Sequence, residues 1–377
     1  MRKILLTILA VTIALLLCEM YLRIRMPQQT YDSLPDAESN CYRTDPITFA
    51  LPKPSSTCVF RTAEYHKKVM IGPQGFVGST TVAKQKNPAI PRIVFIGDSL
   101  TFGQGVSNDE SYPSVIRQLF TTQQKHAEII NASMVGAGPN WYYLRLKHTV
   151  AEYAPDVVVI GLYIGNDFSD LQYFTSTKTD EKGLPLGITT MHEYIDANGM
   201  RRSSSVPMRF RIPILKRSHI FQFITTSVFG AAMSIEQPTA NGSPCLLDNS
   251  CKELHNGIDE TVRLVKGMQH ISDDIGAKLV IVLIPWELQL PRELLQRSDI
   301  QFFATDKTRH LVATTLMTRL ADAHIQTVDL LPAFEAYHGS VPVIYRVDRH
   351  WNKTGHTIAA ETLFPTLYGL VMNSSKE

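Results

Sequence analysis

A short apolar run that stops abruptly is the feature that most constrains this chain. Residues 93–96 are apolar and mostly β-branched, which is typical of a buried strand. Gly97, Asp98 and Ser99 end the run, and a helical pattern begins near Tyr112. A strand that turns tightly into a helix leaves its turn side chains at the carboxyl edge of the sheet, where open α/β sheets bind ligands. Ser99 occupies that position, so it is a candidate nucleophile.

The same alternation of strand and helix continues along most of the chain. Residues 157–163 form an uninterrupted apolar run, which is typical of a strand buried on both faces. Strands that alternate with helices favour a parallel sheet covered by helices on both sides, so we predict an α/β fold. The predicted strands are residues 92–97, 128–134, 157–163, 278–284 and 325–330, and the predicted helices are residues 111–124, 140–152, 257–275, 306–324 and 352–370.

The composition of the chain is that of a globular protein. It has 377 residues, of which 44% are hydrophobic and 19% are charged, enough for a substantial core. The formal net charge is only +2 and no long run of Lys or Arg occurs. The electrostatic attraction on which nucleic-acid binding depends is therefore missing, and we expect no nucleic-acid partner.

The first two dozen residues suit a membrane segment. Residues 4–22 contain one charge, Glu19, and as a helix they would be about 28 Å long, close to the thickness of the bilayer's hydrocarbon core. A cleaved signal peptide, a lipoprotein signal at Cys18 and an uncleaved anchor are the three interpretations. Bulky residues stand where a cleavage site requires small ones, which favours an anchor over residues 1–23. The N-terminal end of this anchor, which carries Arg2 and Lys3, is then expected in the cytoplasm, and the body of the chain is expected outside it.

The cysteines agree with an extracytoplasmic body. Cys18 lies in the predicted anchor, and the other four form two pairs in the sequence, Cys41 with Cys58 and Cys245 with Cys251. An even number outside the membrane predicts two disulfides in an oxidising compartment, although four free thiols are the alternative. No cysteine or histidine spacing matches a zinc site, so we expect neither a metal nor another cofactor.

Two segments interrupt the α/β pattern. Residues 24–90 are rich in Pro, Ser, Thr and Lys, and we interpret them as a stalk and a loosely structured lead-in. Residues 168–256 are too long for an ordinary connection, so they are interpreted as an inserted cap. This insertion either shapes a substrate pocket or packs without contacting substrate. The α/β domain itself is predicted over residues 91–370.

Four short blocks of polar and glycine residues fall at predicted loops of this domain. In order along the chain, they resemble the four blocks of the SGNH, or GDSL, hydrolase superfamily, and the resemblance covers about residues 92–165 and 257–370. The blocks are Gly97-Asp98-Ser99-Leu100, Gly136 within residues 131–138, Gly165-Asn166-Asp167, and Asp348-x-His350-Trp351-Asn352 followed by Gly355-His356.

The resemblance implies a three-layer, doubly wound, flavodoxin-like sheet and a set of residue roles. Ser99 is the expected nucleophile, His350 the general base and then acid, and Asp348 the group that orients His350. The backbone N–H groups of Ser99 and Gly136 and the side-chain amide of Asn166 are the expected oxyanion donors. These residue types suit the chemistry, since a serine needs a base to become nucleophilic and histidine has a suitable pKa.

One position departs from the common form of the superfamily. That form places the acid three residues before the histidine, where this chain has Val347, whereas Asp348 is two residues before His350. In an extended segment, side chains two residues apart point the same way, so we expect Asp348 to contact His350. The Asp-x-His-Trp pattern is also similar to periplasmic acetyltransferases of the same superfamily that modify polysaccharides.

The sequence therefore predicts a serine esterase anchored in the bacterial inner membrane, with its catalytic domain in the periplasm. The expected substrate is an acyl ester of a small molecule, an O-acetylated glycan or a lipid. An O-acetyltransferase that passes the same acyl group to a sugar is one alternative, and a catalytically silent binding protein is another. Asp98 is expected to cap the turn or the next helix, Asp167 to fix its loop, and His356 to pack or lie at the surface.

Overall fold

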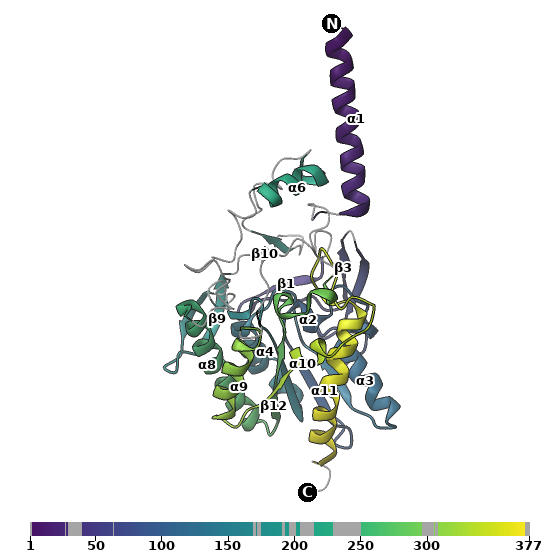
Figure 1. Cartoon of the computed structure of the whole chain (residues 1–377). Helices are drawn as coiled ribbons and strands as arrows, with labels where there is room; N and C mark the ends of the chain where they lie inside the picture. The colour runs from purple at the N-terminus through teal and green to yellow at the C-terminus, as the bar shows by residue number, and fades with distance from the viewer. Residues whose placement is uncertain are drawn as a thin grey trace.

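The computed structural model has a five-stranded parallel sheet at its centre (Figure 1). The sheet order is β13-β12-β7-β5-β6, which in chain order of the five strands is the flavodoxin-like arrangement 2-1-3-4-5. The strands are β5 (Arg92–Ile96), β6 (Glu128–Asn131), β7 (Val157–Tyr163), β12 (Lys278–Ile284) and β13 (Gln326–Asp329). The structure describes residues 2–26, 28, 40–62, 64–168, 171, 175–190, 193–195, 201–203, 215–228, 250–295, 305 and 308–373.

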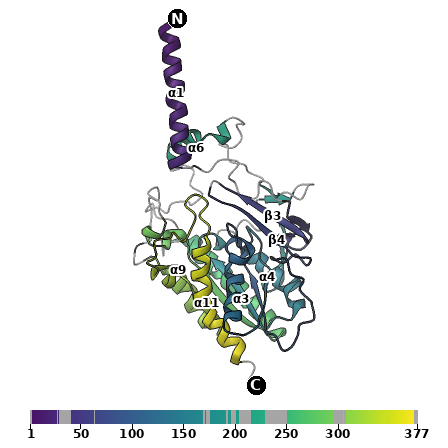
Figure 2. The same cartoon turned by 90° about the vertical axis from the view of Figure 1, so that its right-hand side faces the viewer.

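Helices cover both faces of the sheet, which confirms the predicted three-layer α/β fold (Figures 1 and 2). In β5, Ile93 and Phe95 are buried on one face, whereas Val94 and Ile96 are buried on the other. This alternation explains why the strand is apolar throughout. The first face carries α3 (Tyr112–Thr122), α10 (Leu331–Glu335) and α11 (Lys353–Asn373), and the second carries α4 (Pro139–His148), α8 (Lys252–Asp274) and α9 (Leu311–Ala321).

The ends of several elements differ from the prediction. The predicted strand over 278–284 matches β12, but the one over 128–134 ends at Asn131. There the chain leaves the sheet for a turn in which the N–H of Ala137 donates to the carbonyl of Met134 (3.2 Å). The predicted helix over 257–275 begins earlier, at Lys252, within the segment assigned to the insertion.

The segment before the sheet is more regular than the loosely structured lead-in that the sequence suggested. It contains two antiparallel hairpins, and alternate residues of the second, including Cys58, Phe60, Val69 and Ile71, are buried in the core beside the helices of the second face. The strands are β1 (Tyr42–Asp45), β2 (Phe49–Pro52), β3 (Ser56–Arg61) and β4 (His66–Ile71).

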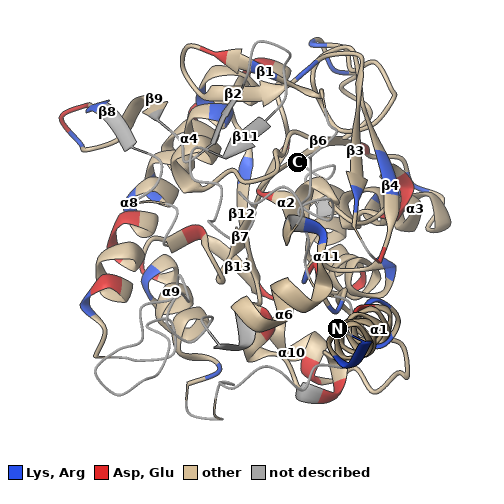
Figure 3. Ribbon diagram, turned by 90° about the horizontal axis from the view of Figure 1, so that it is seen from above, with Lys and Arg blue, Asp and Glu red and all other residues tan. Residues whose placement is uncertain are grey.

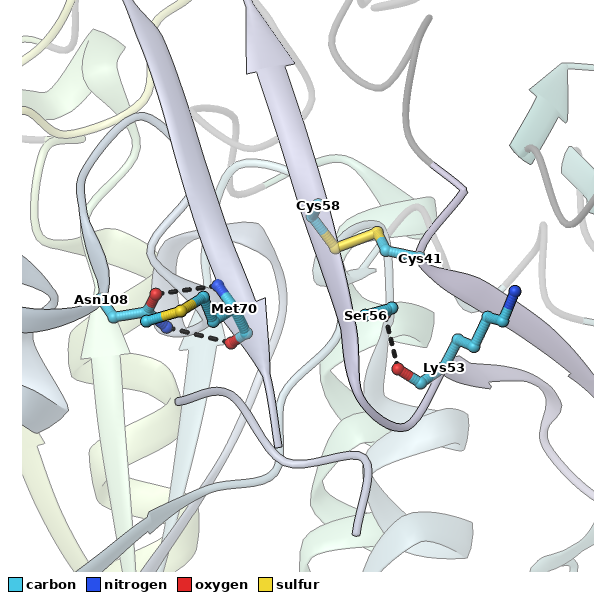
Figure 4. Close-up of a disulfide and its surroundings, with 6 residues drawn as sticks. All are labelled: Cys41, Lys53, Ser56, Cys58, Met70 and Asn108. Carbon is cyan, nitrogen blue, oxygen red and sulfur yellow. Dashed lines mark hydrogen bonds between the residues drawn. A yellow bond between two sulfur atoms is a disulfide. The ribbon is translucent and has the colours of Figure 1, made fainter. Parts of the chain in front are cut away.

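A disulfide between Cys41 and Cys58 ties the start of this segment to β3 (Figure 4). On the other side of the hairpin, the side chain of Asn108 accepts from the N–H of Met70 (2.8 Å) and donates to its carbonyl (3.1 Å), as Figure 4 shows. Cys251 is also disulfide-bonded, and Cys245, its predicted partner, lies outside the described residues. The second hairpin is therefore fixed both by a covalent bond and by the loop that follows Ser99.

The predicted insertion and anchor complete the chain. Within the predicted insertion, the described residues include the strands β8 (Thr175–Thr179), β9 (Pro185–Thr190), β10 (Glu193–Ile195) and β11 (Arg201–Ser203) and the helix α6 (His219–Val228). The first helix, α1 (Arg2–Arg25), projects from the domain (Figure 1). Among the described residues, it alone is long and apolar enough to cross a membrane, with a mean hydropathy of 2.3. By length and composition it suits a membrane span or a signal sequence.

Candidate active site

Ser99 lies at the carboxyl edge of the sheet, at the start of the short helix α2 (Ser99–Phe102). Asp98 caps this helix, since its carboxylate accepts from the N–H of Leu100 (2.9 Å). Gly97 is required before it, because a Cβ at that position would lie 2.2 Å from Oγ1 of Thr101. The turn therefore holds Ser99, which is half-buried, at the end of β5.

The structure brings Ser99, His350 and Asp348 together. Nε2 of His350 lies 2.8 Å from Oγ of Ser99, and Nδ1 of His350 is hydrogen-bonded to Oδ1 of Asp348. The side chain of Asp348 is 2% exposed and that of His350 is 20% exposed, so the carboxylate is buried while the imidazole remains partly accessible to solvent. With its proton on Nδ1, the imidazole donates to Asp348 and can accept from the hydroxyl of Ser99.

The geometry of the Asp348 segment differs from the extended one assumed from the sequence. Residues 346–348 form a turn, and Arg349 adopts the left-handed conformation, with φ of +73°. Such a conformation costs on the order of 1–3 kcal/mol for a residue other than glycine. The guanidinium of Arg349 is held by Glu287, at 3.2 Å. Asp348 reaches His350 because the backbone reverses between them, and not because the two side chains share one face of a strand.

The turn that carries Asp348 is supported by the tip of the β3–β4 hairpin. The carboxylate of Glu64 accepts from three consecutive backbone N–H groups of this turn, those of residues 346, 347 and 348, at 2.7 to 2.9 Å. The hydroxyl of Tyr65 donates to the second carboxylate oxygen of Asp348. Sequence reasoning missed Glu64 and Tyr65, because they precede Asp348 by more than 280 residues and no motif marks them.

A third side chain that the sequence did not single out is Gln104. It is buried, and its amide nitrogen lies 3.4 Å from Nδ1 of His350. Gln104 lies two residues beyond the end of α2, between Gly103 and Gly105. The loop after the candidate nucleophile thus returns to the histidine and packs beside its bond to Asp348.

Charge pairing shifts the pKa values of the two central groups in opposite directions. Burial alone would raise the pKa of Asp348, but the charge of His350 and hydrogen bonds from His350 and Tyr65 lower it. Burial alone would lower the pKa of His350, yet the Asp348 carboxylate raises it above 6.5. Burial also raises the pKa of Asp98 to about 6. At neutral pH this arrangement favours an ionised Asp348 beside an imidazole that readily accepts a proton.

Gly136 and Asn166 lie in turns that follow the two strands beside β5. Gly136 adopts a left-handed conformation, with φ of +65°, beyond the end of β6. The N–H of Met134 donates to the carbonyl of Gly97 (3.2 Å), which draws this segment against the Ser99 turn. Asn166 is half-buried in the turn after β7. Both candidate oxyanion donors therefore belong to the loops that flank Ser99.

Asp167 fixes the turn that contains Asn166. Its carboxylate is fully buried and accepts from the hydroxyl of Tyr142 and the N–H of Tyr163, both at 2.9 Å. These bonds connect the end of β7 to helix α4. The structural role expected for Asp167 is thus present in the structure.

The residues that follow His350 in the fourth sequence block are packed in the interior of the domain. Trp351 is buried and stacks on Phe334, with ring centroids 5.0 Å apart. Gly355 allows close packing, because a Cβ there would lie 2.4 Å from the carbonyl of Val343. His356 is fully buried, and burial lowers its pKa to about 3, so it stays neutral. Among the described residues, no group of three or more His, Cys, Asp or Glu side chains could hold a metal ion.

Comparisons with solved structures give distant matches. These include one described as "Crystal Structure of TesA" (13% identity, TM-score 0.42, covering 74% of this chain and 99% of that chain). A second is an acetyl xylan esterase, AlAXEase, with 15% identity and a TM-score of 0.40, covering 73% of this chain and 99% of that chain. A third is the psychrotrophic esterase EstA from Pseudoalteromonas sp., with 11% identity and a TM-score of 0.37, covering 74% of this chain and 98% of that chain. No curated protein matches the chain.

A family-level match is more decisive. The sequence model of the GDSL-like Lipase/Acylhydrolase family matches residues 93–363. This range covers most of the chain and runs from β5, before Ser99, to a point beyond His350. The chain therefore belongs to the GDSL-like lipase/acylhydrolase family, the SGNH/GDSL hydrolases, and is a serine hydrolase.

Proposed function

We propose that this protein is a serine esterase that hydrolyses acyl esters with Ser99 as nucleophile, His350 as general base and Asp348 as orienting acid. The observation that carries the proposal is the bond between Nε2 of His350 and Oγ of Ser99, at 2.8 Å, together with the bond from the other ring nitrogen to buried Asp348. This geometry lets a histidine take the proton of a serine hydroxyl while a fixed carboxylate stabilises the resulting imidazolium.

The reaction then proceeds in two half-reactions. Oγ of Ser99 attacks the acyl carbon as its proton passes to Nε2 of His350, and the carbonyl oxygen becomes an oxyanion. The tetrahedral intermediate expels the alcohol, which takes the proton from His350, and leaves an acyl-serine. Water attacks this ester with His350 again acting as the base, and the free acid leaves Ser99 restored.

The oxyanion donors in this scheme are the N–H groups of Ser99 and Gly136 and the amide of Asn166. Their support is the placement of both loops beside the Ser99 turn. Donors fixed in advance at the site where charge develops stabilise the transition state more than the bound substrate. The proposed arrangement therefore predicts effects on kcat more than on KM.

Replacing Asn166 tests this arrangement. We expect Asn166→Ala to lower kcat by about 10²- to 10³-fold with little change in KM, since one side-chain oxyanion donor is removed. Asn166→Asp keeps the shape but cannot donate when ionised, so it should be at least as slow. Steady-state kinetics on p-nitrophenyl acetate provide the measurement. An Asp variant as fast as the wild type would exclude Asn166 as a donor.

Tyr65 is a positioning residue in this scheme, because it acts through Asp348. We expect Tyr65→Phe to lower kcat/KM by roughly tenfold, since a hydrogen bond to a charged group is lost. Without that bond more of the Asp348 charge acts on His350, so the pKa of His350 rises further. Activity requires neutral His350, so the rising limb of the kcat/KM–pH profile should move to higher pH. If Tyr65→Phe lowered the rate but left the rising limb of the kcat/KM–pH profile at the same pH, Tyr65 would have a purely structural role.

The location of the protein is part of the proposal. We place α1 in a bacterial inner membrane and the hydrolase domain in the periplasm, in contact with an acylated glycan, lipid or small ester. The supporting observations are the length and hydropathy of α1, the positive residues at its N-terminal end, and the Cys41–Cys58 disulfide. Disulfides of this kind persist in oxidising compartments.

Covalent labelling tests the assigned chemistry. Purified protein should hydrolyse p-nitrophenyl acetate, and an organophosphonate should inactivate it while adding one phosphonyl group to the peptide that contains Ser99. Neither turnover nor labelling would refute the hydrolase assignment to this site. Transfer of the acyl group to an added oligosaccharide in preference to water would instead identify the protein as an acyltransferase.

A further inference from the structure

Glu19 is the one charged residue in the apolar part of α1, and its carboxylate is bound by the insertion. It accepts from the N–H groups of His219 and Ile220, both at 2.9 Å, and from the hydroxyl of Ser218 at 3.0 Å. Arg23 also pairs with it at 2.9 Å. The carboxylate thus satisfies N–H groups at the start of α6, which have no partner within that helix.

The helix that Glu19 caps is apolar and partly uncovered. Its ten residues, His219–Val228, include no Asp, Glu, Lys or Arg. Phe223 is 36% exposed and Ile224 is 47% exposed. These two adjacent apolar side chains are available to contact another apolar medium.

The position of α6 along α1 identifies that medium. Glu19 precedes Leu22, the end of the apolar run, by three residues, or about 4.5 Å along the helix axis. Helix α6 lies beside the last turns of α1 and across its axis (Figures 1 and 3). It is therefore placed at the boundary between hydrocarbon and headgroups, where amphipathic helices lie in the plane of a membrane.

Charge at this level is complementary to anionic lipid. Arg23 and Arg25 occupy the last turn of α1, and Arg217, which is exposed, stands just before α6. Cationic side chains close to a bilayer surface are attracted to anionic headgroups. Apolar residues and adjoining cations on neighbouring elements are the combination that binds a bilayer surface.

We propose that α6 is an interfacial helix that lies in the surface of the same bilayer that α1 spans, with Phe223 and Ile224 inserted among the lipids and Glu19 locking it to α1. The proposal rests on the membrane anchoring by α1 proposed above. It also assigns Glu19 a role, since the carboxylate stabilises the junction of the two helices at the membrane boundary.

The arrangement orients the hydrolase domain. The guanidinium of Arg346 donates to the carbonyl of Arg25, at the end of α1 (3.4 Å), and Arg346 belongs to the turn that carries Asp348. Leu22, near the end of α1, is buried. The carboxyl edge of the sheet, with Ser99, therefore faces the same bilayer surface as α6.

Site-directed fluorescence tests the proposal on the full chain. Ile224→Cys in a Cys18→Ser background is labelled with an environment-sensitive fluorophore and reconstituted in vesicles of phosphatidylethanolamine and phosphatidylglycerol. Leu186→Cys is the matched control, because Leu186 is also 47% exposed but lies on β9. We expect blue-shifted emission and quenching by lipids with brominated acyl chains at position 224 only. Equal, water-like signals would overturn the proposal, as would a blue shift without lipid quenching, which would indicate a covering protein.

Variants of Glu19 test whether this carboxylate holds α6 against α1. Glu19→Leu makes α1 more apolar and so keeps it in the membrane, but it removes the acceptor for α6, and quenching at position 224 should fall toward the control level. Glu19→Gln retains an acceptor oxygen and should keep most of the quenching. Unchanged quenching in Glu19→Leu would exclude the proposal that Glu19 holds α6 against α1.

Two further measurements separate this proposal from the hydrolase assignment. Intact mass establishes whether α1 is retained, and a mature protein without α1 overturns the interfacial helix. Turnover of soluble p-nitrophenyl acetate is measured in every labelled variant. Normal turnover without lipid quenching refutes only the interfacial helix, whereas lipid quenching without turnover in the unmutated protein refutes only the esterase.

Discussion

Ser99→Ala is expected to lower kcat/KM for p-nitrophenyl acetate by about 10⁴- to 10⁶-fold, as loss of the nucleophile does in other serine hydrolases. The methyl group of alanine cannot form an acyl-enzyme, so only transition-state stabilisation by the remaining donors would persist. The fold should be preserved, because the carboxylate of Asp98, and not the hydroxyl of Ser99, caps α2. Far-ultraviolet circular dichroism and thermal unfolding would verify that the variant is folded.

Ser133→Ala is the matched control for this experiment. Ser133 is a buried serine in the segment after β6, and its hydroxyl has no hydrogen-bond partner among the described residues. Removing an unsatisfied hydroxyl costs little stability, so activity should remain near the wild-type level. If Ser99→Ala also retained wild-type turnover, the nucleophile would have to be another residue.

Asp348→Asn is expected to have the second largest effect, a loss in kcat of about 10⁴-fold, by analogy with the same change in a Ser-His-Asp triad. Asparagine removes the charge that stabilises the imidazolium, and its NH₂ group favours the histidine tautomer that cannot accept from serine. The raised pKa of His350 depends mainly on the Asp348 carboxylate. The pKa of His350 should therefore be lower in the variant than in the wild type. A kcat/KM–pH profile would measure both the loss of rate and this shift in pKa.

The control for charge loss is Asp109→Asn, since Asp109 is exposed and lies in the loop after α2. It should leave both the rate and the profile unchanged. A rate for Asp348→Asn close to that of the wild type would instead indicate a Ser-His dyad, with the turn around Asp348 serving only to place the histidine.

Local sequence was sufficient where a single stretch of chain determines the structure. The apolar run before Gly97 predicts β5 because every side chain of that strand is buried, on one face of the sheet or the other. The same reasoning predicted the ends of β12, where apolar residues follow Lys278 without a break as far as Pro285. The loops that carry Ser99, Gly136 and Asn166 follow from these strands, because parallel strands end at one edge.

Contacts between distant segments could not be predicted in this way. Glu64 and Tyr65 lie in a hairpin whose polar composition suggested loose structure, and their role depends on a turn nearly 300 residues away. The left-handed conformation of Arg349 carries no sequence signal, because arginine rarely adopts it. The sequence predicted the Asp348–His350 contact but not the backbone path that creates it.

The Cys41–Cys58 disulfide gives the β3–β4 hairpin a chemical dependence that its hydrogen bonds do not have. The bridge closes a loop with a sequence separation of 17, and bridges of that size stabilise a fold by roughly 3 kcal/mol. Cys58 lies on the strand that leads to the tip where Glu64 and Tyr65 hold Asp348. Reduction of this disulfide is therefore expected to loosen the hairpin and, with it, the contacts that Glu64 and Tyr65 make with the Asp348 turn.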